Sequence, residues 1–324
     1  MRFGMLHLYA NPGDLSERQA IQEQLRLMRA AEDLDFDSVW PAEHHFSPLG
    51  YTASPAIGLA ALAAETRRIR LGTGVVVLPF SNPIRVAEDF AFLDHLSDGR
   101  VDLGIGCGAQ PSEFEHFRID PTTAHARMEE GLEVIRQAWL DGRVDLRGRF
   151  HRFDDVPVHP TPVQTPHPPI WMAAVSGESF ERAGRLGCNL LSGTVLGLNR
   201  SVAAQRRADY LSGLEKGGHP AEDFSSGCLV IVYVADTVEQ ARHEFGAAEA
   251  WYRSTIGRFI APESDPEDSV VCGSPEFVTQ RLAELEQTYG FTDLLCWTRL
   301  GVLAQDKVLR SMELMQHKVM PHLR

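Results

Sequence analysis

Short apolar runs alternate with segments of helical periodicity along most of the chain. The apolar runs occupy residues 2–9, 36–40, 69–78, 100–106, 170–174, 188–193, 228–235 and 291–297. Helical spacing of apolar residues marks 18–34, 54–66, 82–97, 126–139, 177–187, 199–218, 237–256, 274–290 and 306–323. Consecutive β-α units predict a parallel sheet. Eight strand candidates predict an α/β protein with a (β/α)8 TIM barrel, and an open doubly wound sheet is the alternative.

The stretch 146–169 interrupts this alternation. It holds six prolines and shows little helical period. We expect an irregular insertion with short antiparallel strands between strands four and five. No repeat of 20–50 residues and no low-complexity linker divides the sequence, so we interpret residues 1–324 as a single barrel domain.

Composition narrows the classes of function. Of the 324 residues, 44% are hydrophobic, and the net charge is −13. The negative charge and the lack of a dense Lys/Arg cluster argue against a nucleic-acid partner. No apolar run nears the ~20 residues of a membrane span, and the N-terminus does not look like a signal peptide. Five scattered cysteines fit a reducing compartment, so we expect a cytoplasmic protein without membrane contact.

Working residues of such barrels lie at the carboxyl ends of the strands and in the loops that follow. Polar or glycine-rich strand ends are expected to converge there, at Leu6-His7, Gly72-Thr73-Gly74, 104–108, Ser176-Gly177, Ser192-Gly193-Thr194 and Thr298-Arg299. The long loops 107–123 and 258–274 are expected to form the substrate pocket beside this mouth.

The segment Glu43-His44-His45 follows the second strand directly and has three interpretations. As metal ligands, only Glu43 and His45 could share a face of an extended chain, and no third ligand is evident. In the second interpretation the histidines are structural: one would donate a hydrogen bond to loop carbonyls, and the other would be exposed. As catalytic residues, His44 and His45 would be hydrogen-bond donors or a general base, because imidazole exchanges protons near neutral pH.

Two further motifs each leave two interpretations open. The "GIGCGA" segment (104–109) matches a loose dinucleotide-binding pattern, but no apolar helix follows it. Its glycines either let a flat ligand approach the backbone or allow tight packing at a strand end. Ser176, Gly177 and Ser179 precede a helical segment whose N-terminus either binds a phosphate or is simply capped by serine.

Several motifs together resemble the bacterial luciferase-like flavin monooxygenases. They are "EHHF" after "FDSVW", "LGTGVVVLP" followed by "NPIRVAEDFAFLDHLSDGR", the strand end "GIGCG" and the terminal "VMPHLR". The likeness runs nearly end to end, in order and at similar spacing. It implies a barrel that binds reduced FMN, uses molecular oxygen on a small-molecule substrate, and receives its flavin from a separate flavin reductase.

The resemblance also assigns roles to individual residues. It implies that His44 is a catalytic base or proton donor and that His45 supports the same site. It implies a non-prolyl cis peptide at Gly74-Val75 beneath the flavin ring. It places the flavin phosphate at the turn formed by Ser176, Gly177 and Ser179.

The strand end at Gly106-Cys107 belongs to the same implied cofactor site, and there the sequence departs from luciferase. Cys107 stands where luciferase has a phosphate-binding arginine, and Val175 stands where it has a glutamate. Because Cys107 brings no positive charge, Arg299 at the end of strand eight is our candidate for that charge.

Four functions are compatible with these patterns. "EHHF" favours an FMNH₂-dependent monooxygenase over a deazaflavin-dependent dehydrogenase on the same barrel. The third is a flavin-binding protein without catalysis, and the fourth is a metal hydrolase.

The helix predicted at 54–66 has an unusual surface. It is apolar nearly all round and lacks the polar stripe of a solvent-facing barrel helix. Together with 85–97 it is expected to form a two-fold homodimer interface.

Overall fold

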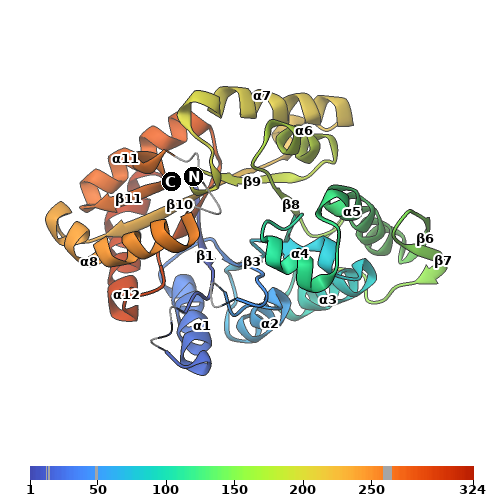
Figure 1. Cartoon of the computed structure of the whole chain (residues 1–324), viewed down its shortest axis with the longest axis horizontal. Helices are drawn as coiled ribbons and strands as arrows, with labels where there is room; N and C mark the ends of the chain where they lie inside the picture. The colour runs from blue at the N-terminus through green and yellow to red at the C-terminus, as the bar shows by residue number, and fades with distance from the viewer. Residues whose placement is uncertain (12, 14, 48–49, 258–264) are drawn as a thin grey trace.

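The computed structural model describes residues 1–11, 13, 15–47, 50–257 and 265–324. Within them, eight parallel strands close into a barrel (Figure 1). In order round the barrel these are β1 (Arg2–His7), β2 (Ser38–Pro41), β3 (Arg70–Gly72), β5 (Val101–Gly106), β8 (Ile170–Ala173), β9 (Asn189–Gly193), β10 (Ser226–Val234) and β12 (Asp293–Trp297). Because β9 pairs with β10 and β12 pairs with β1, the ring is closed. The predicted barrel is confirmed, and the open sheet is wrong.

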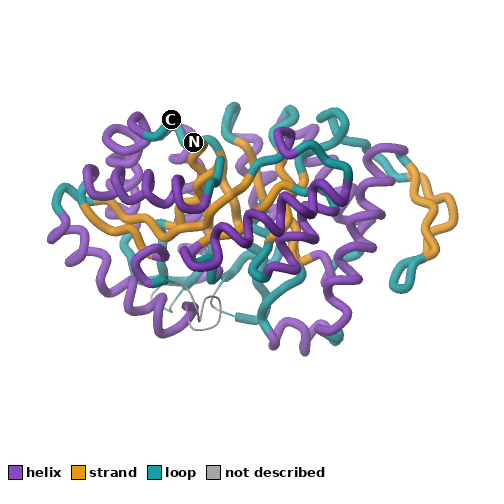
Figure 2. The backbone as a smooth tube through the Cα atoms, turned by 90° about the horizontal axis from the view of Figure 1, so that it is seen from above, coloured by secondary structure: helices purple, strands orange, loops and turns teal. Residues whose placement is uncertain are grey.

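Helices surround the strands (Figure 2). The long ones are α1 (Glu17–Asp33), α2 (Pro55–Glu65), α3 (Pro83–Ser97), α5 (Ala124–Asp141), α6 (Gly177–Arg185), α7 (Arg200–Gly217), α8 (Val238–Tyr252), α11 (Pro275–Tyr289) and α12 (Gln305–Leu314). Several of these helices begin at residues that are typical of helix N-termini. Ser16 forms a capping box with Gln19, and the side chain of Asn82 caps α3 ahead of Pro83. In the described part of the chain, no helix is both long and apolar enough to cross a bilayer.

Three segments differ from the sequence-based expectation. The strand expected at 69–78 is divided into β3 and β4 (Val76–Val77), and the Gly74-Val75 peptide between them is cis, as expected. The loop expected at 107–123 contains the short helix α4 (Pro111–Phe117). The loop expected at 258–274 contains α10 (Pro266–Ser269) and an extra strand, β11 (Val270–Gly273), which pairs with β10. Its residues 258–264 lie outside the described residues.

An antiparallel hairpin lies between β5 and β8, as predicted, but it spans 143–157, and five of the six prolines of the insertion follow it in a segment without helix or strand. Its strands are β6 (Arg143–Arg147) and β7 (Arg152–Pro157), and Figure 2 shows it projecting from the barrel. The Glu130 carboxylate on α5 accepts the backbone N–H groups of Arg149 and Phe150 at 2.7 and 2.9 Å. This carboxylate therefore ties the hairpin turn to the body of the protein.

Two tryptophans contribute to the packed interior of the barrel. The rings of Trp40 and Trp171 meet edge to face at 5.3 Å, and Trp171 donates its Nε1–H to Asp102 at 3.2 Å. Glycine is required beside them, because a Cβ on Gly72 would lie 2.3 Å from the Trp40 ring. Both tryptophans are almost fully buried. The barrel is therefore a solid core here, and a ligand site is expected at its mouth.

His7 faces the helix layer rather than the barrel mouth, in contrast to the expectation for the first strand end. Its Nδ1 lies 2.9 Å from Oε1 of Gln24 on α1, and the side chain is buried. Burial lowers the pKa of His7 to about 4, although the Gln24 hydrogen bond partly opposes this shift. His7 is therefore neutral in the folded protein near neutral pH.

We expect His7 to make the protein less stable in mild acid. The unfolded chain binds a proton at this histidine below about pH 6.5, whereas the folded chain does so only below about pH 4. The free energy of unfolding should therefore fall between these values by up to about 1.4 kcal/mol per pH unit. Urea unfolding at pH 7 and pH 4.5 checks this. His7→Gln should show a smaller loss than the wild type, and an equal loss in both proteins would contradict the prediction.

Candidate active site

Glu43 joins the end of β2 to the segment that follows β3. Its backbone N–H donates to the Val75 carbonyl at 3.2 Å, and its Oε2 accepts the Val77 N–H at 3.1 Å. Its other carboxylate oxygen lies 2.9 Å from Nε2 of His45. Glu43 is buried, and its two carboxylate oxygens are bonded to one backbone N–H and one imidazole. The Gly74-Val75 segment and the histidine pair therefore form one connected unit at the barrel mouth.

Glu113 on α4 is the partner of His44. Its Oε1 lies 3.2 Å from Nδ1 of His44 and accepts the backbone N–H of His45 at 2.8 Å. A carboxylate at Nδ1 favours the tautomer with the proton on that nitrogen. No residue of the described chain bonds to Nε2 of His44, whose side chain is 19% exposed. His44 can therefore present Nε2 to a ligand. Nothing in the local sequence marked Glu113, because its role depends on α4 folding over the loop after β2.

An aromatic wall stands beside the histidines. The ring of Phe117 stacks on Phe80 with centroids 4.7 Å apart and meets His45 edge-on at 4.8 Å. Phe46 lies 5.1 Å from Phe117 and is 60% exposed. An exposed large aromatic side chain beside two histidines provides an apolar surface for a ligand.

The glycines at the end of β5 serve close packing. A Cβ on Gly104 would lie 1.8 Å from the Thr73 carbonyl oxygen, and one on Gly106 would lie 2.7 Å from the Val75 side chain. Of the two interpretations of "GIGCGA", the structure supports tight packing at these two positions. The packing brings Gly106 and Cys107 next to the Gly74-Val75 segment.

Cys107 is a protonated thiol beside a histidine and an arginine. Its Sγ lies 2.9 Å from Nδ1 of His125, and Nη1 of Arg182 lies 3.2 Å from the same nitrogen. Burial raises the pKa of Cys107 to about 12, although the charge of Arg182 opposes this. Arg182 is itself paired with Glu129 at 2.8 Å and with Glu178 at 2.5 Å. The cation near Cys107 is thus largely neutralised by carboxylates.

The turn before α6 is a capping box with open backbone donors. Ser176 Oγ accepts the Ser179 N–H at 3.3 Å, and Ser179 Oγ accepts the Ser176 N–H at 2.9 Å. The first-turn amides of Gly177 and Glu178 have no acceptor within the described residues. Arg206 on α7 reaches this turn together with its ion-pair partner Asp209, because a Cβ on Gly177 would lie 2.4 Å from Arg206 Nη1 and 2.7 Å from Asp209 Oδ2. No local pattern in the sequence marked Arg206.

Arg299 is engaged on another side of the barrel. Its Nη2 lies 3.2 Å from Glu23 on α1, and its Nη1 donates to the carbonyls of Leu300 and Gly301. The side chain is only 6% exposed. None of these contacts is with the turn before α6. The structure therefore brings Arg206, and not Arg299, into contact with Gly177.

The described residues contain no group of three or more His, Cys, Asp or Glu side chains arranged to hold a metal ion. In particular, Glu43 and His45 bond to each other, and Glu113 bonds to His44. The histidine pair is thus built into two hydrogen-bonded carboxylate–imidazole pairs.

Comparison with known proteins gives the family. The model of the luciferase-like monooxygenase family matches residues 1–292. The oxygenase component of the flavin-dependent trigonelline monooxygenase of Acinetobacter baylyi is 30% identical, over 99% of this chain and 95% of its own. The crystal structure of monooxygenase RslO1 from Streptomyces bottropensis has a TM-score of 0.92 at 29% identity and covers 100% of both chains.

Two more distant structures share the fold and differ in their cofactor. The oxygenating constituent of 3,6-diketocamphane monooxygenase from Pseudomonas putida, solved with FMN, has a TM-score of 0.85 at 20% identity, over 99% of this chain and 98% of that one. A coenzyme F420-dependent tetrahydromethanopterin reductase from Methanopyrus kandleri has a TM-score of 0.76 at 19% identity, over 100% of this chain and 99% of that one. At these identities only the fold is shared. With a family model matching most of its length, the chain belongs to the luciferase-like monooxygenase family.

Proposed function

We propose that this protein is the oxygenase component of a two-component, FMNH₂-dependent monooxygenase that inserts one atom of molecular oxygen into a small organic substrate. The observation that carries the proposal is the pair His44 and His45, each held by a buried carboxylate and joined through Glu43 to the Gly74-Val75 segment. A separate flavin reductase is proposed as its partner, since the relative from Acinetobacter baylyi is named as an oxygenase component.

The residues at the mouth suit a flavin phosphate and a flat ring. The open amides of Gly177 and Glu178 and the Ser176 hydroxyl would hold a phosphate at the N-terminus of α6, and the Arg206 guanidinium would be shared between this phosphate and Asp209. Ser179 would support them by fixing the turn. The ends of β3 and β5, with Gly74, Val75, Gly106 and Cys107, would contact the ring. A bound reduced flavin would supply the two electrons with which oxygen reacts.

The chain itself would supply positioning and proton transfer. The Glu113 carboxylate fixes the His44 ring through Nδ1, so Nε2 is the atom that would give or accept a proton at the reacting centre. His45 would keep the buried Glu43 paired and close one side of the site. The phenylalanines at 46, 80 and 117 would exclude water and contact the apolar part of a substrate.

A deazaflavin-dependent dehydrogenase is the second candidate, because the F420-dependent reductase shares this fold. Anaerobic titration separates the two functions. The purified protein is titrated with FMNH₂ and with reduced deazaflavin while tryptophan fluorescence is followed. We expect FMNH₂ to quench the emission at micromolar concentration and deazaflavin to do so poorly. The reverse order would favour the dehydrogenase. Flavin binding in this titration without product formation once oxygen and substrate are added would favour a non-catalytic flavin protein.

Arg206→Gln should weaken FMNH₂ binding about ten-fold, since a charge-assisted hydrogen bond contributes about 1.5–3 kcal/mol. The same titration measures this. Arg299→Ala is the comparison. The Arg299 guanidinium is bonded to Glu23 and makes no contact with the turn before α6, so its removal should change the dissociation constant by less than about two-fold. A large loss with Arg299→Ala and none with Arg206→Gln would assign the charge to Arg299 instead.

We also propose that the protein is a homodimer through α2 and α3. These helices leave large apolar side chains exposed, at 74% for Ile57, 58% for Phe92 and 49% for Leu96. Large apolar side chains that are exposed on two helices in contact with each other are typical of an interface between proteins. Light scattering at micromolar protein should give twice the mass of one chain, and Phe92→Asp should shift it toward one chain. A wild-type protein with the mass of one chain would refute the dimer.

A further inference from the structure

A second cavity lies outside the barrel, between α7 and the outer faces of β9 and β10. Its volume is about 330 Å³, within the range of small-ligand sites. Figure 1 shows α7 lying beside β9, with α6 and α11 on either side. The apolar walls of this outer cavity include Phe180, Leu190, Leu198, Ala203, Leu214 and Phe224. Neither histidine of the proposed active site lines it.

The outer cavity has an unsatisfied polar group in its wall. Ser192 is the fourth residue of β9, and its side chain lines the outer cavity. It is only 3% exposed, and its Oγ has no hydrogen-bond partner among the described residues. A buried hydroxyl without a partner is costly, so a ligand oxygen or nitrogen at this point would be favoured.

The rim of the outer cavity carries more positive than negative charge. Arg207 is exposed and has no ion pair within the described chain, and its guanidinium lies against Gly290 at the end of α11. Arg206 also lines the rim but is 3.3 Å from Asp209. Glu222 is the one carboxylate among the lining residues described. The unpaired Arg207 is therefore positioned to accept an anionic group.

We propose that the outer cavity binds a small apolar carboxylate that carries a second oxygen. The carboxylate would pair with Arg207, the apolar body would lie between α7 and the strands, and the second oxygen would bond to Ser192 Oγ. Such a site is separate from the barrel mouth, and among the described residues it shares only Arg206, at its rim, with the proposed flavin site.

The test uses two probes that differ by one hydroxyl, 3-(4-hydroxyphenyl)propanoate and 3-phenylpropanoate, in isothermal titration of the flavin-free protein. We expect the hydroxylated probe to bind about ten-fold more tightly, and Ser192→Ala to remove that difference. Arg207→Gln should weaken both probes about ten-fold without disturbing the fold, because its side chain is exposed.

Two tryptophan substitutions locate the bound probe. Ala203→Trp should fill the outer cavity and abolish binding, whereas Ala204→Trp, on the exposed face of the same helix, should leave it unchanged. Binding that is absent at millimolar probe would overturn the proposal. Binding that survives both Ala203→Trp and Arg207→Gln would do the same, since the probe would then lie elsewhere.

Discussion

His44→Ala should reduce formation of oxygenated product by about 10²–10⁴-fold, the usual contribution of a general acid or base. Its Nδ1 is fixed by Glu113, and Nε2 is the atom available to a ligand. The substitution removes that proton carrier and leaves the turn before α6 intact, so flavin affinity should change little. Reduced flavin should still be oxidised, with hydrogen peroxide released in place of product. Product and peroxide measured in the same reaction check both parts.

His45 and His116 provide the comparisons for His44. His45→Ala should reduce product formation less than His44→Ala does. It should lower the free energy of unfolding more, because it leaves the buried carboxylate of Glu43 without its imidazole partner. His116→Ala changes an exposed histidine on α4 and should leave the product rate near wild type. Wild-type product formation by His44→Ala would show that the pair is structural.

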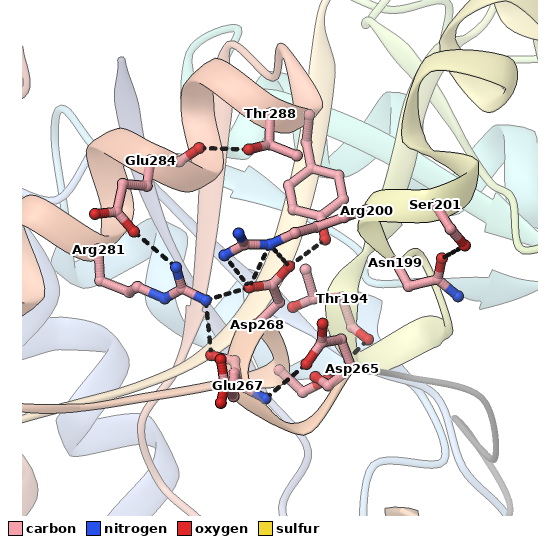
Figure 3. A network of polar contacts seen from close by, with 12 residues as sticks. Thr194, Asn199, Arg200, Ser201, Asp265, Glu267, Asp268, Arg281, Glu284 and Thr288 are labelled. Carbon is pink, nitrogen blue, oxygen red and sulfur yellow. Dashed lines mark hydrogen bonds and ion pairs between the residues drawn. The ribbon is translucent and has the colours of Figure 1, made fainter.

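Asp268→Ala should destabilise the fold by about 3 kcal/mol, the low end of the range for breaking a buried ion pair. Asp268 is fully buried and lies at the centre of a network (Figure 3). It accepts two hydrogen bonds of 2.9 Å from Arg200, one from Tyr289 at 2.6 Å, and one from Arg281. The network joins α7, α10 and α11 beside β9, since Ser269 Oγ also donates to the Thr194 carbonyl at 3.1 Å. The loss is at the low end because Arg200 is 47% exposed and can be resolvated.

Glu267→Ala is the matched control for Asp268→Ala. Glu267 is the preceding residue and is exposed, so its removal should change the free energy of unfolding by less than about 0.5 kcal/mol. Urea unfolding at pH 7 compares the two variants. A loss below about 1 kcal/mol for Asp268→Ala would contradict the stabilising role of this network.

The Asp268 network should also weaken in acid. Burial, the largest single influence, raises the pKa of Asp268, but the Arg200 and Tyr289 hydrogen bonds and the charges of Arg200 and Arg281 together leave it below its ordinary value. The stabilisation is therefore present above about pH 4 and is lost as the pH falls toward the lowered pKa.

The barrel could be predicted from the sequence because its strands are apolar runs separated by capped helices. The elements that were missed are short. The helix α4 has seven residues and β11 has four, too few to establish a period. The orientation of His7 toward the helix layer was also missed. Neighbouring strand residues point to opposite faces, and the sequence did not show which face is inward.

The candidate site was predictable only where its residues are local in sequence. His44, His45 and the serine turn are contiguous motifs, and the structure keeps each motif together. Glu113 and Arg206 reach the site from α4 and α7, more than twenty residues away from the groups they contact. Such contacts arise from tertiary packing and have no local signature. The same packing places Arg299 against Glu23.

The proposed reaction uses reduced FMN and oxygen to oxygenate a small molecule. Its most direct measurement is mass spectrometry of products formed under ¹⁸O₂ from a panel of aldehydes, ketones and aromatic compounds, with NADH, FMN and a flavin reductase. We predict a product that carries one ¹⁸O atom with the wild-type protein and little of it with His44→Ala. No labelled product from any member of the panel, together with hydride transfer from reduced deazaflavin, would contradict the proposed oxygenation.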